Sequence, residues 1–93
     1  MLVMVIERLR RGAIEAIRQR FRSHGRMLPD GVTYLDSWFD VRGERCFQIM
    51  EAPDVTALDP WLSAWSDLIA FEITPIQTSE SFWEEIDRRS ELP

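Results

Sequence analysis

A chain of 93 residues is long enough for one domain and too short for two. Hydrophobic residues make up 45% and charged residues 29%, a globular balance that excludes disorder as the default state. The net charge of -5 disfavours nucleic acid and anionic membranes as main partners, and we predict neither.

The single cysteine, Cys46, excludes an intramolecular disulfide and a multi-cysteine zinc site. His24 is the only histidine, and it has no second metal ligand at a recognisable spacing. The apolar run at residues 1–6 is shorter than a signal sequence or a membrane span. We therefore predict a cytoplasmic protein with no metal and no cofactor.

Positive charge is concentrated in the first part of the chain. Residues 1–26 carry seven arginines against two acidic residues, whereas residues 27–93 carry four arginines against fourteen. A basic first helix could bind a phosphate-bearing ligand. A solvated face of ion pairs is the commoner use of such arginines, and it is the one we predict.

The first two predicted elements are a strand and a helix. Residues 1–9 are apolar at odd and even positions, which is typical of a central strand covered on both faces. Residues 13–24 place Ile14, Ile17 and Phe21 on one helical stripe, and Gly25 ends the helix.

A β-hairpin is predicted next, from strands 32–39 and 45–51 and a short turn containing Gly43. Placing Asp40 opposite Arg45 fixes a register in which both faces of the hairpin are mostly apolar. One face then holds the pairs Trp38–Phe47 and Asp36–Ile49, and the other holds Phe39–Cys46, Ser37–Gln48 and Leu35–Met50.

The last part of the chain predicts a helix, a strand and a tail helix. Asp59 and Pro60 form a helix start, and the helix is expected over 60–70. A strand follows over 71–77, at a sheet edge because Pro75 cannot donate to an inner ladder. We divide the chain into a domain at 1–78 and a helical tail at 79–93, which starts with a capping box and packs on the domain or on a partner.

The order β-α-β-β-α-β, with an extra C-terminal helix, predicts an α+β ferredoxin-like plait with an antiparallel sheet. Right-handed crossovers put strands one and three in the centre and both main helices on one face. The other face of the sheet is also apolar. A second copy packed face to face would cover it, so we predict a homodimer of the dimeric α/β-barrel type.

Four segments carry a family resemblance, and in chain order they read MLVMVIER, RFRSHGRMLPDGVTYLDSWFD, RCFQIMEAPD and WLSAWSDLIAFEITPI. They resemble the domain-of-unknown-function 3303 family of small bacterial proteins, within the dimeric α/β-barrel superfamily. The resemblance implies a ferredoxin-like protomer and a two-sheet barrel, and it implies no activity. The wider superfamily includes cofactor-free monooxygenases and isomerases, so an enzyme of that kind is an alternative by fold analogy alone.

Several residues of the hairpin and the second helix are candidates for a ligand site. Strict alternation along the strand places Tyr34, Asp36 and Trp38 on one face, where they form either an aromatic pocket wall with a carboxylate or a packed dimer face. Mid-strand polar groups need partners, either each other or a ligand. The predicted ligand-binding residues are Tyr34, Asp36, Ser37, Trp38, Cys46, Gln48 and Trp65.

Each candidate also has a purely structural interpretation. Cys46 is more often a small buried hydrophobe than a nucleophile, and Trp65 is more often core than pocket. The sequence leaves two main hypotheses: a dimeric protein that binds a small apolar or aromatic molecule between sheet and helices, or a structural or interaction module with no ligand. An open pocket of several hundred Å³ favours the first hypothesis.

Overall fold

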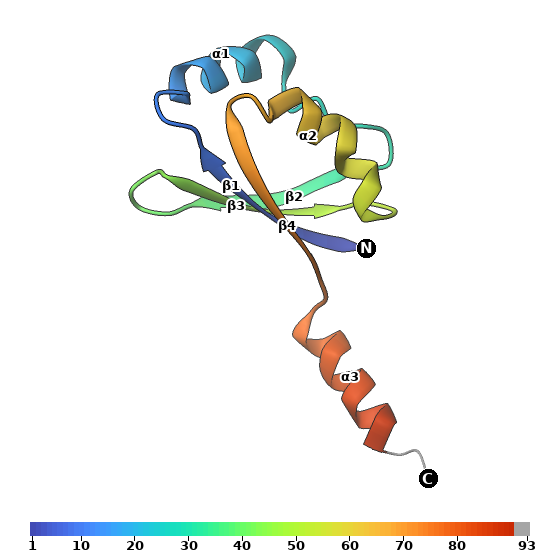
Figure 1. The fold of residues 1–93 in the computed structure, drawn as a ribbon. Coiled ribbons are helices and arrows are strands. Elements are labelled where there is room, and N and C mark those ends of the chain that lie inside the picture. Colours follow the sequence, from blue (N-terminus) through green and yellow to red (C-terminus); the bar gives the residue numbers. More distant parts are fainter. Residues whose placement is uncertain (91–93) are drawn as a thin grey trace.

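A computed structural model describes residues 1–90 of the chain as one sheet, with two helices lying above it and a third extending below (Figure 1). The elements in order are β1 (Leu2–Leu9), α1 (Ile14–His24), β2 (Thr33–Phe39), β3 (Arg45–Glu51), the 3-10 turn η1 (Val55–Leu58), α2 (Asp59–Trp65), β4 (Ile69–Ile76) and α3 (Ser79–Ser90).

The sheet has the order β2-β3-β1-β4, and every neighbouring pair is antiparallel. The predicted α+β fold is therefore confirmed, with β1 and β3 in the centre. β4 pairs only with β1, so Pro75 lies on an edge strand as predicted. Val3 and Val5 of β1 point toward α1 and α2 and are fully buried, and they form the centre of the core with Met50, Leu58 and Trp61.

The hairpin has the predicted register except at one position. Asp36 pairs with Ile49 and Trp38 with Phe47, but a β-bulge falls between Tyr34 and Asp36. Tyr34, not Leu35, lies opposite Met50. The prediction that Tyr34 shares a face with Asp36 was wrong, because a bulge adds one residue to the strand and shifts the alternation before it.

α2 ends at Trp65, five residues earlier than predicted, and β4 begins at Ile69. Side chains from α1 and from the loop that follows β1 satisfy the last carbonyls of α2, which bonds within the helix cannot. Arg10 donates from two nitrogens to the Ser66 carbonyl at 2.9 and 3.1 Å, and Arg20 donates to the Ala64 carbonyl at 2.8 Å. These long-range contacts cannot be seen in a local pattern.

α1 stands off from the sheet. None of its residues is buried, and Ile14 and Phe21 keep 65% and 45% of their surface exposed, although the sequence gives them an apolar stripe. Ile17 is the residue of that stripe that packs against the core. The stripe therefore faces inward across a gap and does not rest on the strands.

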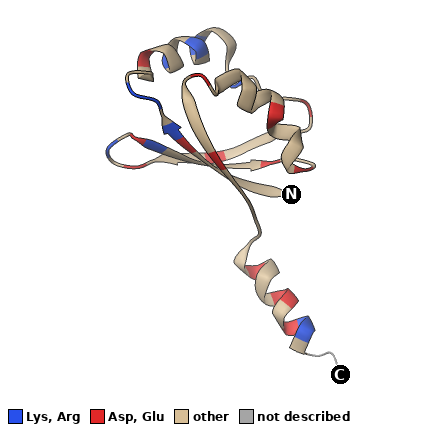
Figure 2. Cartoon of the chain, in the orientation of Figure 1, with Lys and Arg blue, Asp and Glu red and all other residues tan. Residues whose placement is uncertain are grey.

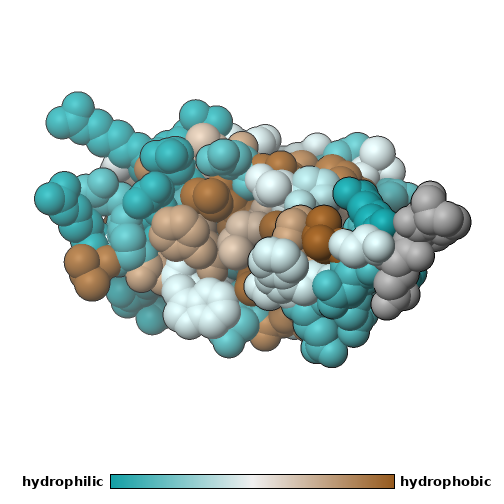
Figure 3. Space-filling model, turned by 90° about the horizontal axis from the view of Figure 1, so that it is seen from below, coloured by the Kyte–Doolittle hydropathy of each residue, from teal (hydrophilic) through white to brown (hydrophobic). Residues whose placement is uncertain are grey.

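The side of the sheet away from α1 and α2 is uncovered within a single protomer. We call it the open face. Its apolar part includes Leu2, Met4, Ile6, Trp38, Phe47, Ile49 and Ile76. Figure 3 views the molecule from this side, with α3 toward the viewer, and shows apolar side chains gathered across the middle.

α3 extends away from the domain on the open-face side of the sheet (Figure 1). The Thr78 hydroxyl accepts from the Ser81 N–H at 3.0 Å, so the helix is capped at Thr78, ahead of the predicted capping box. The Cα radius of gyration is 16.2 Å, against about 12 Å for a compact chain of this length. The predicted tail at 79–93 thus does not fold back on its own domain over the described part, and residues 91–93 lie outside the description.

Candidate functional site

A cavity of about 510 Å³ lies between the sheet and the helices α1 and α2. We call it the helix-side cavity. Its lining comes from all four strands, from α1 and α2 and from the loop after α1. It comprises Glu7, Leu9, Ile14, Ile17, Arg18, Phe21, Arg22, Arg26, Ser37, Phe39, Cys46, Gln48, Trp61, Trp65 and Ile69. Its volume falls within the range of pockets that bind small molecules.

Aromatic rings form much of the cavity wall. Trp61 and Trp65, one helical turn apart on α2, are almost fully buried at 2% and 4% exposure. The Trp61 ring packs at 5.0 Å from that of Phe71, and the Trp65 indole N–H donates to the Arg26 carbonyl at 3.0 Å. These contacts fix both indoles, so the wall is preformed.

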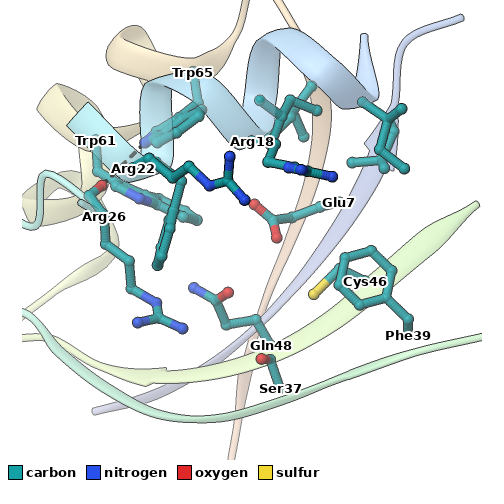
Figure 4. A pocket seen from close by; sticks show the side chains of 15 residues that line it. Glu7, Arg18, Arg22, Arg26, Ser37, Phe39, Cys46, Gln48, Trp61 and Trp65 are labelled. Carbon is teal, nitrogen blue, oxygen red and sulfur yellow. Dashed lines mark hydrogen bonds between the residues drawn. The ribbon is translucent and has the colours of Figure 1, made fainter. Parts of the chain in front are cut away.

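Polar side chains rise from the sheet into this apolar space. Glu7 of β1 lies opposite Cys46 of β3 in the ladder, and Figure 4 shows Glu7 and Gln48 directed into the cavity. The Gln48 amide donates to the Met50 sulfur at 3.2 Å, and Ser37 shares a 2.6 Å hydrogen bond with the Tyr34 hydroxyl. A thioether is a weak acceptor, so Gln48 keeps capacity for a stronger partner.

Glu7 is the buried carboxyl of the site, with 9% of its surface exposed. Removal from water raises its pKa above the ordinary value, while a hydrogen bond with the Cys46 thiol and the charge of Arg26 oppose that shift less strongly. A proton on Glu7 would make it a hydrogen-bond donor toward the cavity.

Glu7→Gln is expected to raise the melting temperature at pH 8 and to change it little near pH 4. A carboxyl whose folded pKa is raised binds more protons in the folded state, so its contribution is most favourable below the ordinary glutamate pKa and is lost as pH rises through the folded pKa. The gain at pH 8 should be on the order of 1 kcal/mol. Thermal unfolding across this pH range measures it.

Glu15→Gln is the matched control, since Glu15 is exposed on α1. Its melting temperature should follow the wild-type curve at every pH. A Glu7→Gln effect of the same size at pH 4 and pH 8 would contradict the ionisation argument.

Cys46 is 3% exposed, and burial raises the pKa of its thiol to about 12, with further contributions from the charge and hydrogen bond of Glu7. Thiolate chemistry requires the deprotonated form, which is negligible at neutral pH with such a pKa. The arrangement supports Cys46 as a packed hydrophobe, in preference to a nucleophile.

We expect Cys46 in the native protein to react with a chromogenic disulfide reagent at least about a hundredfold more slowly than in urea-unfolded protein, because both access and thiolate content are low. The absorbance of the released thiolate measures both rates. Labelling at equal rates in the two states would restore a reactive-cysteine hypothesis.

Arginines surround the mouth of the helix-side cavity. Arg18 and Arg22 extend from α1, one turn apart, and Figure 2 shows the positive charge gathered in this region of the molecule. Arg26 lies with its guanidinium carbon 3.6 Å from the Tyr34 ring centroid and 5.3 Å from that of Phe21. The next residue, Met27, has a φ of 59°, an uncommon conformation for a side chain larger than glycine.

The structure brings together four of the predicted ligand-binding residues, namely Ser37, Cys46, Gln48 and Trp65. Tyr34 is not a lining residue, but its hydroxyl is hydrogen-bonded to the hydroxyl of Ser37. Asp36 and Trp38 are on the open face and do not line the helix-side cavity. Sequence reasoning missed Glu7 and the arginines at the mouth.

The family profile described as Domain of unknown function (DUF3303) matches residues 1–88. The chain belongs to this family. No curated protein and no solved structure gives a significant match. The DUF3303 match covers every element described above except the last residues of α3.

In residues 1–90 of this DUF3303 protein, no helix has both the length and the apolar character needed to cross a membrane. Within the same range, no group of three or more His, Cys, Asp and Glu side chains is arranged to hold a metal ion.

Proposed function

We propose that this protein binds a small, mainly apolar or aromatic molecule in the helix-side cavity. The observation that carries the proposal is a cavity of about 510 Å³ in which fixed aromatic walls converge on buried Glu7 and Gln48. Ligand sites are typically apolar hollows with a few well-placed polar groups. The hypothesis of a module without a ligand is supported less well, because it predicts a closed core and the protein has an open cavity.

Blocking the mouth of the cavity tests this function. Ile14→Trp enlarges an exposed residue on the cavity lining, so it should obstruct entry without disturbing the core. We expect the variant to bind the neutral fluorescent probe phenylnaphthylamine at least about tenfold more weakly than wild type, as measured by fluorescence titration.

Ala16→Trp is the matched control, because it adds an indole at an exposed position of α1 outside the cavity lining. It should bind the probe as wild type does. Equal binding to wild type and Ile14→Trp, or no binding to any of the proteins, would overturn the proposed function.

We also propose that the functional form is a homodimer joined through the open face. The open face presents aliphatic and aromatic side chains, and Trp38 alone keeps 53% of its surface exposed in one protomer. Soluble monomers rarely leave such a contiguous apolar surface uncovered. A sheet-to-sheet pair would form the dimeric α/β barrel that the resemblance implies, and it would leave both helix-side cavities on the outside.

α3 supports the same assembly. Its Phe82 and Trp83 are 41% and 59% exposed, and its place on the open-face side puts it where a partner would lie. A helix that carries exposed aromatic residues and stands clear of its own domain gains stability only by packing against another surface.

A further inference from the structure

We propose that the ligand of the helix-side cavity is an amphipathic organic anion: a flat apolar body ending in a carboxylate or a comparable anionic group, which Arg18 and Arg22 bind at the mouth. This inference rests on the proposed function, and it adds the charge and the orientation of the ligand.

The arginines of α1 fall into two structural groups. Arg20 is committed to the fold, because its guanidinium makes a two-pronged contact with the Asp67 carboxylate at 2.7 and 2.8 Å and also binds the Ala64 carbonyl. Arg18 and Arg22 make no ion pair and no side-chain hydrogen bond within residues 1–90. Both lie on the cavity lining, so their donors remain available to a ligand.

Arg18 and Arg22 are four residues apart, which places them next to each other on one face of the helix. Like charges at that spacing repel each other in the absence of an anion. The solvated ion pairs that the sequence predicts for the arginines of this region are not formed by Arg18 or Arg22 within residues 1–90. An anion at the mouth would relieve this repulsion and accept hydrogen bonds from both guanidinium groups.

The interior of the cavity determines which end of the ligand enters. Glu7 is the only carboxylate among the lining residues of the described chain, and it lies on the sheet side, across from α1 (Figure 4). An anionic group placed beside Glu7 would be repelled or poorly solvated, whereas an uncharged hydroxyl or carbonyl could bond with Glu7 or Gln48. The apolar body then lies against the indoles of Trp61 and Trp65.

Two probes that share one aromatic skeleton test the charge preference: anilinonaphthalene sulfonate, which is anionic, and phenylnaphthylamine, which is neutral. We expect the double variant Arg18→Gln/Arg22→Gln to bind the anionic probe about tenfold more weakly than wild type, with the affinity for the neutral probe unchanged. Added salt should weaken the binding of the anionic probe only, because its ion pairs with Arg18 and Arg22 are exposed to solvent.

Arg11→Gln is the control for loss of a nearby positive charge, since Arg11 lies just before α1 and outside the cavity lining. It should leave both affinities as in wild type. If the double variant binds the anionic probe normally, or if Arg11→Gln weakens it equally, this inference is overturned while binding of the neutral probe still supports the proposed function. Both proposals are supported if Ile14→Trp binds neither probe while wild type binds both and distinguishes the anionic probe from the neutral one.

Discussion

Met4→Arg is expected to abolish the proposed homodimer, whereas Val3→Arg is expected to prevent folding. Met4 lies on the open face in the central strand, paired with Ile49 on one side and Thr74 on the other. Val3 points the opposite way and is fully buried. An interface of the usual size removes about 800 Å² per protomer from water, and a charge at its centre would be left without a partner.

Light scattering and circular dichroism separate these outcomes. Wild type should have the mass of two chains at micromolar concentration. Met4→Arg should lose that mass and either aggregate or show a much lower melting temperature, because the open face of each protomer becomes exposed. Val3→Arg should show no cooperative transition, since an unpaired buried charge costs several kcal/mol. A wild-type chain that is a stable, folded monomer at this concentration would rule out the dimer.

Trp65→Ala should lower the free energy of unfolding by about 3–5 kcal/mol. The indole is 4% exposed, lies beneath the guanidinium of Arg20 at 5.4 Å, and donates to the carbonyl of Arg26. Truncation removes the packing, opens the helix-side cavity further, and frees the segment that carries Arg26. Urea denaturation followed by circular dichroism measures the loss.

Trp38→Ala is the informative comparison. The sequence predicts a loss of about 3–5 kcal/mol for this residue as well, on the assumption that it is buried. In a single protomer Trp38 is 53% exposed, so its truncation should weaken the dimer more than the protomer fold. The stability difference from wild type should therefore depend on protein concentration.

If Trp65→Ala lowers the free energy of unfolding by less than about 1 kcal/mol, the cavity wall is not fixed as described.

Most of the fold could be predicted from the sequence because each strand carries a pattern that survives in the folded chain. The Asp40–Arg45 pair across the hairpin gives the register, and the observed turn keeps it, with the Asp40 N–H bonded to the Arg45 carbonyl at 3.0 Å. The early end of α2 could not be predicted, since it depends on Arg10 and Arg20, which come from elements far away in the sequence. Local periodicity carries no information about such contacts.

The candidate site was only half predictable, for two separate physical reasons. Glu7 follows Val3 and Val5 at every second position, which is the signal that it faces the covered side of the sheet. That signal is hidden because the intervening residues of β1 are apolar too. The cavity itself arises because α1 stands off from the sheet, and the height of a helix above a sheet is a property of packing that a helical stripe does not encode.

The bulge in β2 changes how the sequence of this strand should be aligned with the sequences of related proteins. Leu35 is the extra residue. A relative without it would still have Tyr34 opposite Met50 and Asp36 opposite Ile49, with every neighbouring side chain on the same face of the sheet. A one-residue gap at Leu35 therefore does not change which residues lie on either face of the sheet. A gap at any regular ladder position between Asp36 and Phe39 would exchange the cavity side for the open face along part of the strand, and with it the residues that a ligand or a partner could meet.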